Sequence, residues 1–162
     1  MILILTGPTR SHKTTTLLNW ASERNDCGGV LTPDQDGLRM LFNVHDKILL
    51  PFQKNKTTSS TDISIGRFYF DAHVFSLASK WLDAHLTDPN LNYIILDEVG
   101  PLELNGRGWD HWIRTSLKNL GDKTLILVVR HSLLNDVIHH YGLTDAQVEL
   151  TGYFLNFNSG PG

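Results

Sequence analysis

Short apolar runs alternate along the chain with longer segments in which apolar residues recur at helical spacing. Runs that are apolar at consecutive positions are typical of strands in a parallel sheet that is covered on both faces. Three such runs are residues 1–6, 91–96 and 125–129, and further strands are expected at 28–32 and at the start of the tail 148–157. Helical spacing is found over residues 13–24, 74–86, 109–120 and 133–141.

This alternation predicts an α/β fold with a mostly parallel sheet flanked by helices on both faces. In such sheets, ligand sites lie at the carboxyl ends of the strands. The short strand-like pieces between residues 38 and 71 are separated by polar turns, which indicates a small antiparallel excursion between two βα units. Within it, the Lys/Thr/Ser-rich stretch 54–62 has no hydrophobic period and is predicted to be a mobile loop. Residues 1–162 are therefore interpreted as a single domain.

The composition agrees with this fold and excludes several classes of protein. A chain of 162 residues is long enough to bury a core. Its formal net charge of −3 does not favour a broad nucleic-acid surface. Cys27 is the only cysteine, which excludes an internal disulfide framework. The apolar runs are too short for a transmembrane helix, and residues 1–5 lack the basic region of a signal peptide, so we expect a cytoplasmic protein with no membrane partner.

The loop after the first apolar run differs at one position from the phosphate-binding pattern G-x-x-x-x-G-K-[ST]. In that pattern, backbone N–H groups and a helix N-terminus face the phosphates of a nucleoside triphosphate. Lys13 is expected to contact the β- and γ-phosphates, and the Thr14 hydroxyl is expected to bind Mg²⁺. The other reading is a strand-to-helix turn with a surface lysine. The predicted nucleotide-binding residues are Gly7, Pro8, Thr9, Arg10, Ser11, His12, Lys13, Thr14 and Thr15.

His12 is the departure from this pattern, since it replaces a glycine that supplies an unusual backbone conformation. Histidine tolerates positive φ better than most residues, so the loop is expected to form. Whether the substitution lowers or abolishes turnover is left open by the sequence.

Two acids follow the apolar run 91–96. Asp97 is expected to contact the Mg²⁺ shell, and Glu98 is expected to be a catalytic residue that acts as general base on the attacking water, together with Lys13. Side chains alternate along a strand, but we expect the chain to leave the sheet here, so that both acids face the ligand. The alternative is a solvated strand end.

Other charged residues are weaker candidates. Arg130 and His131 follow the third apolar run, where a γ-phosphate sensor or simply a surface pair would lie. Arg10 and Arg107 either neutralise the negative charge that develops on the phosphates during the reaction or are simply solvated. The eight histidines show no spacing of a metal site. Trp109 and Trp112 are spaced for a buried helical face rather than for stacking on a base.

These motifs together resemble the family of small single-domain P-loop nucleoside-triphosphatases. The segment Leu96-Asp-Glu-Val-Gly-Pro-Leu-Glu-Leu104 is similar to the family pattern D-E-[IV]-G-x-[ML]-E, while 29–32, 66–71 and 128–131 resemble its other segments. The resemblance implies a RecA-like P-loop fold and hydrolysis of triphosphates with little base selectivity. It also implies phosphate and magnesium roles for Lys13, Thr14 and Asp97, and a role in water activation for Glu98. Glu103 matches a family position, where an acid that orders the following loop is an equal explanation.

The sequence therefore predicts a Mg²⁺-dependent nucleoside-triphosphatase acting on ATP or GTP with low base specificity. Retention of both acids favours an enzyme, whereas His12 favours a degenerate P-loop module that binds nucleotide with little turnover. A small-molecule kinase is a third possibility, against which stands the lack of an Arg-rich lid segment.

Overall fold

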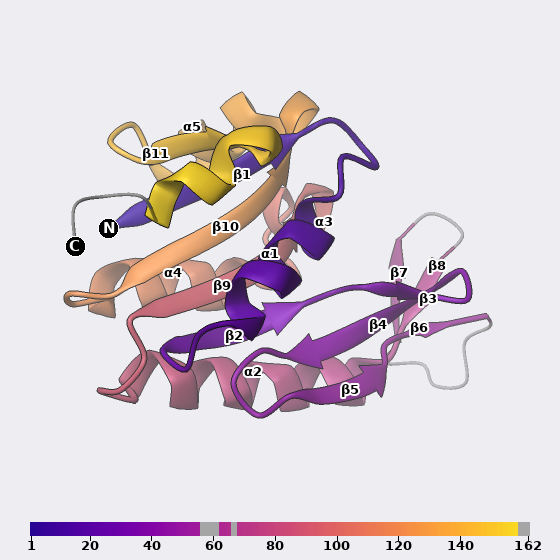
Figure 1. Cartoon of the computed structure of the whole chain (residues 1–162). Coiled ribbons are helices and arrows are strands. Elements are labelled where there is room, and N and C mark those ends of the chain that lie inside the picture. The colour runs from indigo at the N-terminus through magenta and orange to yellow at the C-terminus, as the bar shows by residue number, and fades with distance from the viewer. Residues whose placement is uncertain (56–61, 66–67, 159–162) are drawn as a thin grey trace.

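The computed structural model describes residues 1–55, 62–65 and 68–158. Within them, an eight-stranded sheet has the order β11–β1–β10–β9–β2–β4–β3, with β5 paired to β4 (Figure 1). The strands β11, β1, β10, β9 and β2 run parallel, which confirms the mostly parallel sheet. The bounds of this sheet's strands are β1 (Ile2–Gly7), β2 (Cys27–Leu31), β3 (Asp34–Gln35), β4 (Leu38–Asn43), β5 (Ile48–Pro51), β9 (Tyr93–Val99), β10 (Thr124–Arg130) and β11 (Gln147–Leu150).

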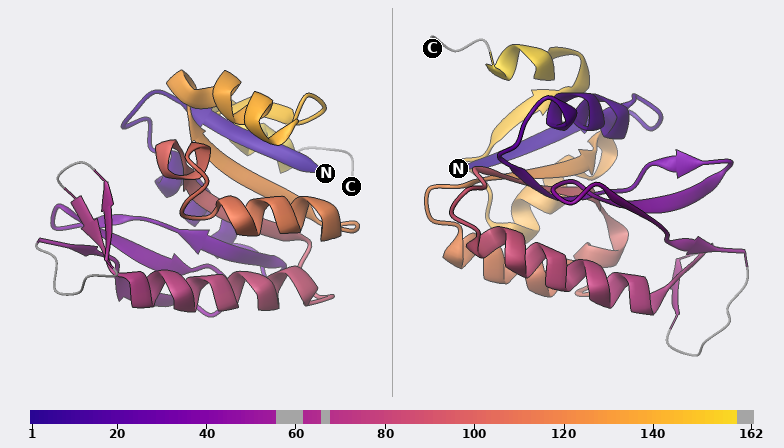
Figure 2. Two further views of the ribbon diagram at one scale, coloured as in Figure 1. Left: turned by 180° about the vertical axis from the view of Figure 1, so that it is seen from behind. Right: turned by 60° about the horizontal axis from the view of Figure 1, so that its bottom comes forward.

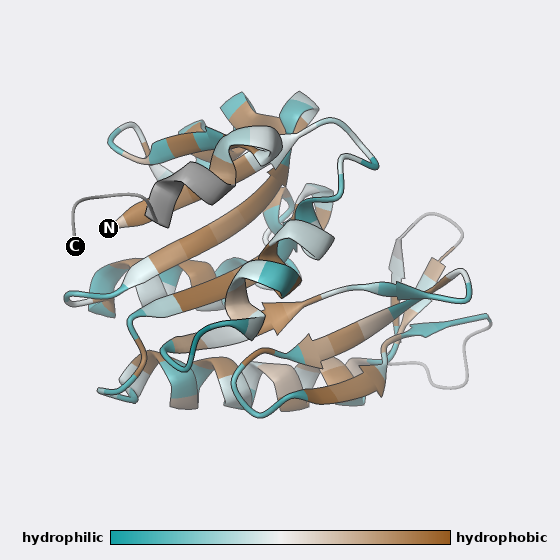
Figure 3. Ribbon diagram, in the orientation of Figure 1, coloured by the Kyte–Doolittle hydropathy of each residue, from teal (hydrophilic) through white to brown (hydrophobic). Residues whose placement is uncertain are grey.

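Helices cover both faces of the parallel strands, which explains why these strands are apolar at consecutive positions (Figures 2 and 3). Leu3 and Leu5 of β1 pack into a core with α1 and the C-terminal 3₁₀ helix, whereas Ile4 packs into the core on the opposite face. The helices are α1 (Lys13–Ser22), α2 (Ala72–Thr87), α3 (Pro101–Leu104), α4 (Asp110–Asn119) and α5 (Leu134–Tyr141), with 3₁₀ helices at His131–Leu133 and Thr151–Asn158. No helix in the described part of the chain could span a membrane.

The strand order brings three distant segments to one edge of the sheet. Strand β10 lies between β1 and β9, so Gly7 at the end of β1 is paired with Arg130 at the end of β10. The last paired residues of β10 and β9 are Val129 and Val99. The loop after β1, the end of β10 and the acids of β9 therefore meet at the carboxyl ends of the strands.

The predicted antiparallel excursion is present and extends the sheet beyond β2 through β4, β3 and β5. It continues into a small separate sheet of β6 (Gln53–Lys54), β7 (Ile63–Ile65) and β8 (Phe68–Phe70), which lies at the amino end of α2 (Figures 1 and 2). Residues 56–61 of the predicted mobile loop, and 66–67 of the 66–71 segment, lie outside the described residues. Residues of the excursion line the same cleft as the loop and the acids, so it borders the same edge of the sheet.

Candidate active site

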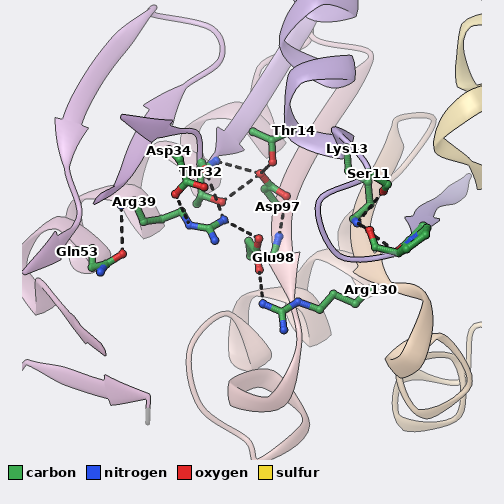
Figure 4. A network of polar contacts seen from close by, with 12 residues as sticks. Ser11, Lys13, Thr14, Thr32, Asp34, Arg39, Gln53, Asp97, Glu98 and Arg130 are labelled. Atoms are coloured by element: carbon green, nitrogen blue, oxygen red, sulfur yellow. Dashed lines mark hydrogen bonds and ion pairs between the residues drawn. The ribbon is translucent and has the colours of Figure 1, made fainter. Parts of the chain in front are cut away.

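The carboxyl ends of the parallel strands and the antiparallel excursion enclose one large cleft of about 1330 Å³. The loop residues 9–15 line one end of it, and aromatic side chains from the excursion, α2 and the start of α4 line the other. Asp97, Glu98, Arg39 and Arg130 also line the cleft, and Figure 4 shows the two arginines on either side of Glu98. Of the weaker candidates, Arg10 lines the cleft, whereas Arg107 and His131 are exposed and are not among its lining residues.

The loop after β1 adopts the backbone conformation that its glycine pattern demands, although one glycine is missing. His12 has φ 61° and ψ 30°, in the left-handed region, and immediately precedes α1. Its side chain makes no cap hydrogen bond and is exposed, while its carbonyl accepts a hydrogen bond from Thr16 N at 2.9 Å. At Gly7, a Cβ atom would meet the hydroxyls of Ser11 and Thr151 at 2.6 Å, so a larger residue here would displace these side chains. The loop thus forms as expected, with the non-glycine residues Arg10 and His12 both at φ 61°.

Lys13, the first residue of α1, turns its side chain back onto the loop. Its Nζ donates to the carbonyl oxygens of Gly7 at 3.1 Å and Pro8 at 2.7 Å, and to Ser11 Oγ at 3.1 Å (Figure 4). Burial lowers the pKa of the Lys13 amine, and the neighbouring carboxylates of Glu98 and Asp97 act in the opposite direction. The amine is held at the mouth of the loop by neutral oxygens.

Thr14 and Asp97 meet although 83 residues separate them in the chain. Thr14 Oγ1 donates to Asp97 Oδ2 at 2.8 Å, and the same oxygen accepts from the Thr32 backbone N–H at 3.0 Å and the Thr32 hydroxyl at 3.1 Å. Asp97 is 1 % exposed. Burial raises the pKa of Asp97, the negative charge of Glu98 raises it further, and the hydrogen bonds from Thr32 and Thr14 lower it. Thr32 lies in a segment that resembled the family pattern, but its contact with Asp97 could not be read from the sequence.

Glu98 reaches the cleft by a different route from the one expected. The predicted strand 91–96 continues to Val99, so both acids lie inside β9 and the chain does not leave the sheet at Asp97. Leu96 pairs with Leu127 and Val99 with Val129, which leaves one extra residue in β9, and Glu98 has φ 62°. A bulge with a residue at positive φ breaks the alternation of side chains. This bulge turns consecutive acids toward one cleft.

Two arginines from different elements contact the Glu98 carboxylate. Arg39 of β4 donates from its guanidinium to Oε1 at 2.6 Å, and a guanidinium nitrogen of Arg130 lies 3.8 Å from Oε2 (Figure 4). Arg39 is itself held by Asp34, 3.3 Å away. Arg130 was a candidate from the sequence, whereas Arg39 was not, because nothing in the local pattern of β4 distinguishes this arginine from a solvated one.

Glu103 and Trp109 also line the cleft. Glu103 is 2 % exposed, and its carboxylate accepts the backbone N–H of Gly100 at 2.9 Å and of Trp109 at 3.1 Å. Burial raises the pKa of Glu103. These bonds order the loop after β9, which agrees with the structural explanation for this acid. Trp109 and Trp112 are both in the core, and Trp109 also lines the cleft.

Comparison with known proteins gives consistent results. A family model described as NTPase matches residues 2–150. The structure of THEP1 from the hyperthermophile Aquifex aeolicus is similar, with a TM-score of 0.70 and 16 % identity over 93 % of this chain and 90 % of that one. A human cancer-related nucleoside triphosphatase has a TM-score of 0.69 and 17 % identity over 99 % and 98 %. No match is found among curated proteins. These likenesses confirm the predicted P-loop NTPase fold.

Proposed function

This chain belongs to the NTPase family, and from that membership we propose that it binds a nucleoside triphosphate with Mg²⁺ and hydrolyses it to the diphosphate and phosphate with low base specificity. The observation that carries the proposal is the 2.8 Å contact between Thr14 Oγ1 and Asp97 Oδ2. It places a hydroxyl of the first turn of α1 against a buried carboxylate at the edge of the sheet, next to a loop of phosphate-binding pattern.

Phosphate is held by the loop and by Lys13. The first N–H groups of a helix have no intrahelical acceptor and carry the positive end of the helix dipole, so the amino end of α1 favours an anion. Lys13 exchanges its bonds to the loop oxygens for bonds to the β- and γ-phosphates. This exchange is favourable because a charged hydrogen bond to phosphate is stronger than one to a neutral carbonyl.

The donors at Thr14 and Asp97 fit Mg²⁺. Both are oxygen atoms, which this ion prefers, and Mg²⁺ usually takes only one or two protein ligands and completes its shell with phosphate and water. The described residues contain no cluster of three or more His, Cys, Asp or Glu that could hold a metal ion without such a partner. When bound there by Thr14 and Asp97, Mg²⁺ would neutralise the negative charge that develops on the phosphoryl group during transfer.

Glu98 accepts the proton of the attacking water, and Arg39 and Arg130 control when it does so. Both arginines contact the Glu98 carboxylate, and the γ-phosphate competes for the same guanidinium groups. When the two arginines move from Glu98 to the γ-phosphate, Glu98 is free to act as a base. Their positive charges then lie beside the phosphoryl group, where negative charge develops in the transition state. Substrate binding thereby assembles the catalytic arrangement.

One observation favours a second function, a nucleotide-binding module with little turnover. The ion pair at 2.6 Å between Arg39 and Glu98, if it persists with nucleotide bound, leaves Glu98 unable to orient water.

Phosphate release from a panel of ATP, GTP, CTP and UTP, with and without Mg²⁺, separates the two functions. If all four triphosphates are hydrolysed, and only when Mg²⁺ is present, the protein is a nucleoside-triphosphatase of low base specificity. Tight Mg²⁺-dependent binding without phosphate release supports the module.

A further inference from the structure

The cleft continues past Glu98 into a region walled by aromatic side chains. Phe70 and Phe75 are half-buried and lie over a buried layer formed by Phe52 and Trp109. The ring centroid of Phe52 lies 5.0 Å from that of Phe70 and 5.5 Å from that of Phe75, and Phe75 stacks on Trp109 at 4.0 Å. All four line the same cleft as the phosphate loop. Partly exposed rings facing a cleft are the usual means of binding a planar ligand by stacking.

This region lies on the far side of Glu98 from the loop. Arg39, which contacts Glu98, accepts on its carbonyl the N–H of Phe52 at 3.3 Å and donates its own N–H to Gln53 Oε1 at 3.2 Å. Figure 4 shows Arg39 and Gln53 on one side of the acids and Lys13 on the other. In phosphoryl transfer, the attacking and leaving oxygens lie on opposite sides of the phosphorus. If the loop holds the leaving diphosphate, the nucleophile approaches from the aromatic side.

The size and charge of the cleft define what could bind there. Its volume of about 1330 Å³ exceeds the range of roughly 300–1,000 Å³ that is usual for one small ligand. The charged residues that border the aromatic region have other roles. Arg39 pairs with Glu98 and Asp34 and is proposed to move to the γ-phosphate, and Glu103 accepts backbone N–H groups. The wall therefore suits an uncharged planar ligand better than a phosphorylated one.

We propose that the region lined by Phe52, Phe70, Phe75 and Trp109 is an acceptor site. It binds an uncharged alcohol of nucleoside size that carries an aromatic ring, and the γ-phosphoryl group is transferred to a hydroxyl of this alcohol. This inference rests on the proposed function of the loop and Glu98. A hydroxyl oxygen of the acceptor forms a bond to the γ-phosphorus, and the bond from that phosphorus to the β–γ bridging oxygen breaks. The hydroxyl proton passes to Glu98 and then to solvent, and the products are a phosphate monoester and the nucleoside diphosphate. Hydrolysis is the same reaction with water in place of the alcohol.

The test uses adenosine, guanosine, cytidine and uridine, with ribose as the non-aromatic control. Each is titrated calorimetrically into protein saturated with Mg²⁺ and an ATP analogue whose β–γ bridge is an imido group. Separately, each is incubated with Mg²⁺-ATP, and the products are identified by mass spectrometry. We expect at least one nucleoside to bind beside the analogue and to yield its monophosphate, whereas ribose does neither.

Two variants test whether the nucleoside binds in the aromatic region. Phe75→Leu and Phe70→Leu each remove a ring, so each should weaken nucleoside binding by roughly tenfold. Two variants are used in case one fails to fold, and thermal melting checks both. Tyr93→Leu is the matched control, because Tyr93 is a half-buried ring at the opposite end of β9 and should leave nucleoside binding unchanged.

Several results would overturn the inference. The first is that no nucleoside binds. A second is that the analogue displaces the nucleoside, which would mean that the base of the triphosphate occupies the aromatic region. A third is that a nucleoside binds but is not phosphorylated, and a fourth is that both ring variants bind it normally. ATP hydrolysis without nucleoside binding would overturn this inference alone, whereas failure of ATP to bind at all would overturn the proposed function as well.

Discussion

Arg39 donates a 2.6 Å hydrogen bond to Glu98, although the two residues are 59 positions apart and belong to the antiparallel excursion and the parallel sheet. The side chains are 26 % and 39 % exposed, so solvent screens the pair and its contribution to the free energy of unfolding is at most about 1 kcal/mol. A contact that contributes so little to stability, in the centre of the cleft, is better explained by its position beside the proposed catalytic base.

Replacing Arg39 tests this explanation. We expect Arg39→Ala to lower the turnover number for ATP by roughly tenfold to a hundredfold, because a charge that stabilises the transferred phosphoryl group is lost. Arg39→Lys should recover little, since an ammonium group cannot reproduce two-point guanidinium contacts. The measurement is steady-state phosphate release. Arg24→Ala is the control, because it removes a comparable 2.8 Å ion pair with Asp26 away from the cleft. Normal turnover in Arg39→Ala would exclude a catalytic role for Arg39.

Glu98→Gln keeps the size of the side chain and removes its basicity. Turnover should fall by roughly 10²-fold or more, while the affinity for triphosphate holds or rises. Single-turnover phosphate release and calorimetric titration measure the two effects separately. The exposed Glu23→Gln should change neither. Should the Glu98 variant hydrolyse ATP at the normal rate, another residue must orient the water.

Lys13→Ala tests the loop as a phosphate site. We expect the affinity for triphosphate to fall at least tenfold, because the proposed charge contact with the β- and γ-phosphates is lost. The fold should survive, since the bonds that Lys13 makes in the structure are to three loop oxygens only. Calorimetric titration measures the affinity, with Lys80→Ala on the exposed side of α2 as the control. Unchanged affinity would mean that the loop does not bind phosphate.

His12 occupies a left-handed position, which glycine adopts without strain and a β-branched residue adopts with difficulty. We therefore expect His12→Val to be less stable than His12→Gly by about 1–2 kcal/mol. Urea unfolding of both variants measures this difference. The same pair of substitutions at Thr9, which is not among the residues of positive φ, should not show the valine penalty. Equal stability of the two His12 variants would contradict the left-handed conformation.

Because the pKa of Asp97 is raised in the folded protein, the sign of its effect on the free energy of unfolding at different pH values can be predicted. A carboxyl group whose pKa is raised in the folded state stabilises the fold below its unfolded pKa, and this contribution is lost as the pH rises through the folded pKa. The free energy of unfolding of the wild type, minus that of Asp97→Asn, should therefore fall as the pH rises from about 4, by at most about 1.4 kcal/mol per pH unit. Urea unfolding without nucleotide or Mg²⁺ at several pH values measures it.

Asp26→Asn is the control of opposite sign. The hydrogen bond from Arg24 lowers the pKa of Asp26, so its contribution to stability is present above the unfolded pKa and is lost as the pH falls. The corresponding difference should therefore rise with pH below about 4 and then level off. A difference for Asp97 that rises in the same way would show that its ionised form is favoured in the folded protein.

The sequence by itself determined the main strands and helices of the parallel part of this fold, and the two motifs from which a phosphate site is proposed. Runs such as 1–6 and 125–129 could be identified as buried strands because a strand covered on both faces has no polar side, and that property is local. The loop ending in Lys13 and Thr14 and the adjacent acids Asp97 and Glu98 were equally visible, because each motif is contiguous. The family resemblance followed from the same contiguous segments.

Only the tertiary structure decided how these parts meet. The position of β10 between β1 and β9 depends on strand pairing across the whole chain, and it alone brings Arg130 to Glu98. The bulge that turns Asp97 and Glu98 into one cleft depends on the register of β9 against β10. Arg39, Phe52 and Phe70 come from a segment whose short strands have no distinctive local pattern, and they meet Phe75 of α2 and Trp109 only in the folded chain. Their roles are set by contacts with residues far away in the chain, and a pattern read along the sequence does not record such contacts.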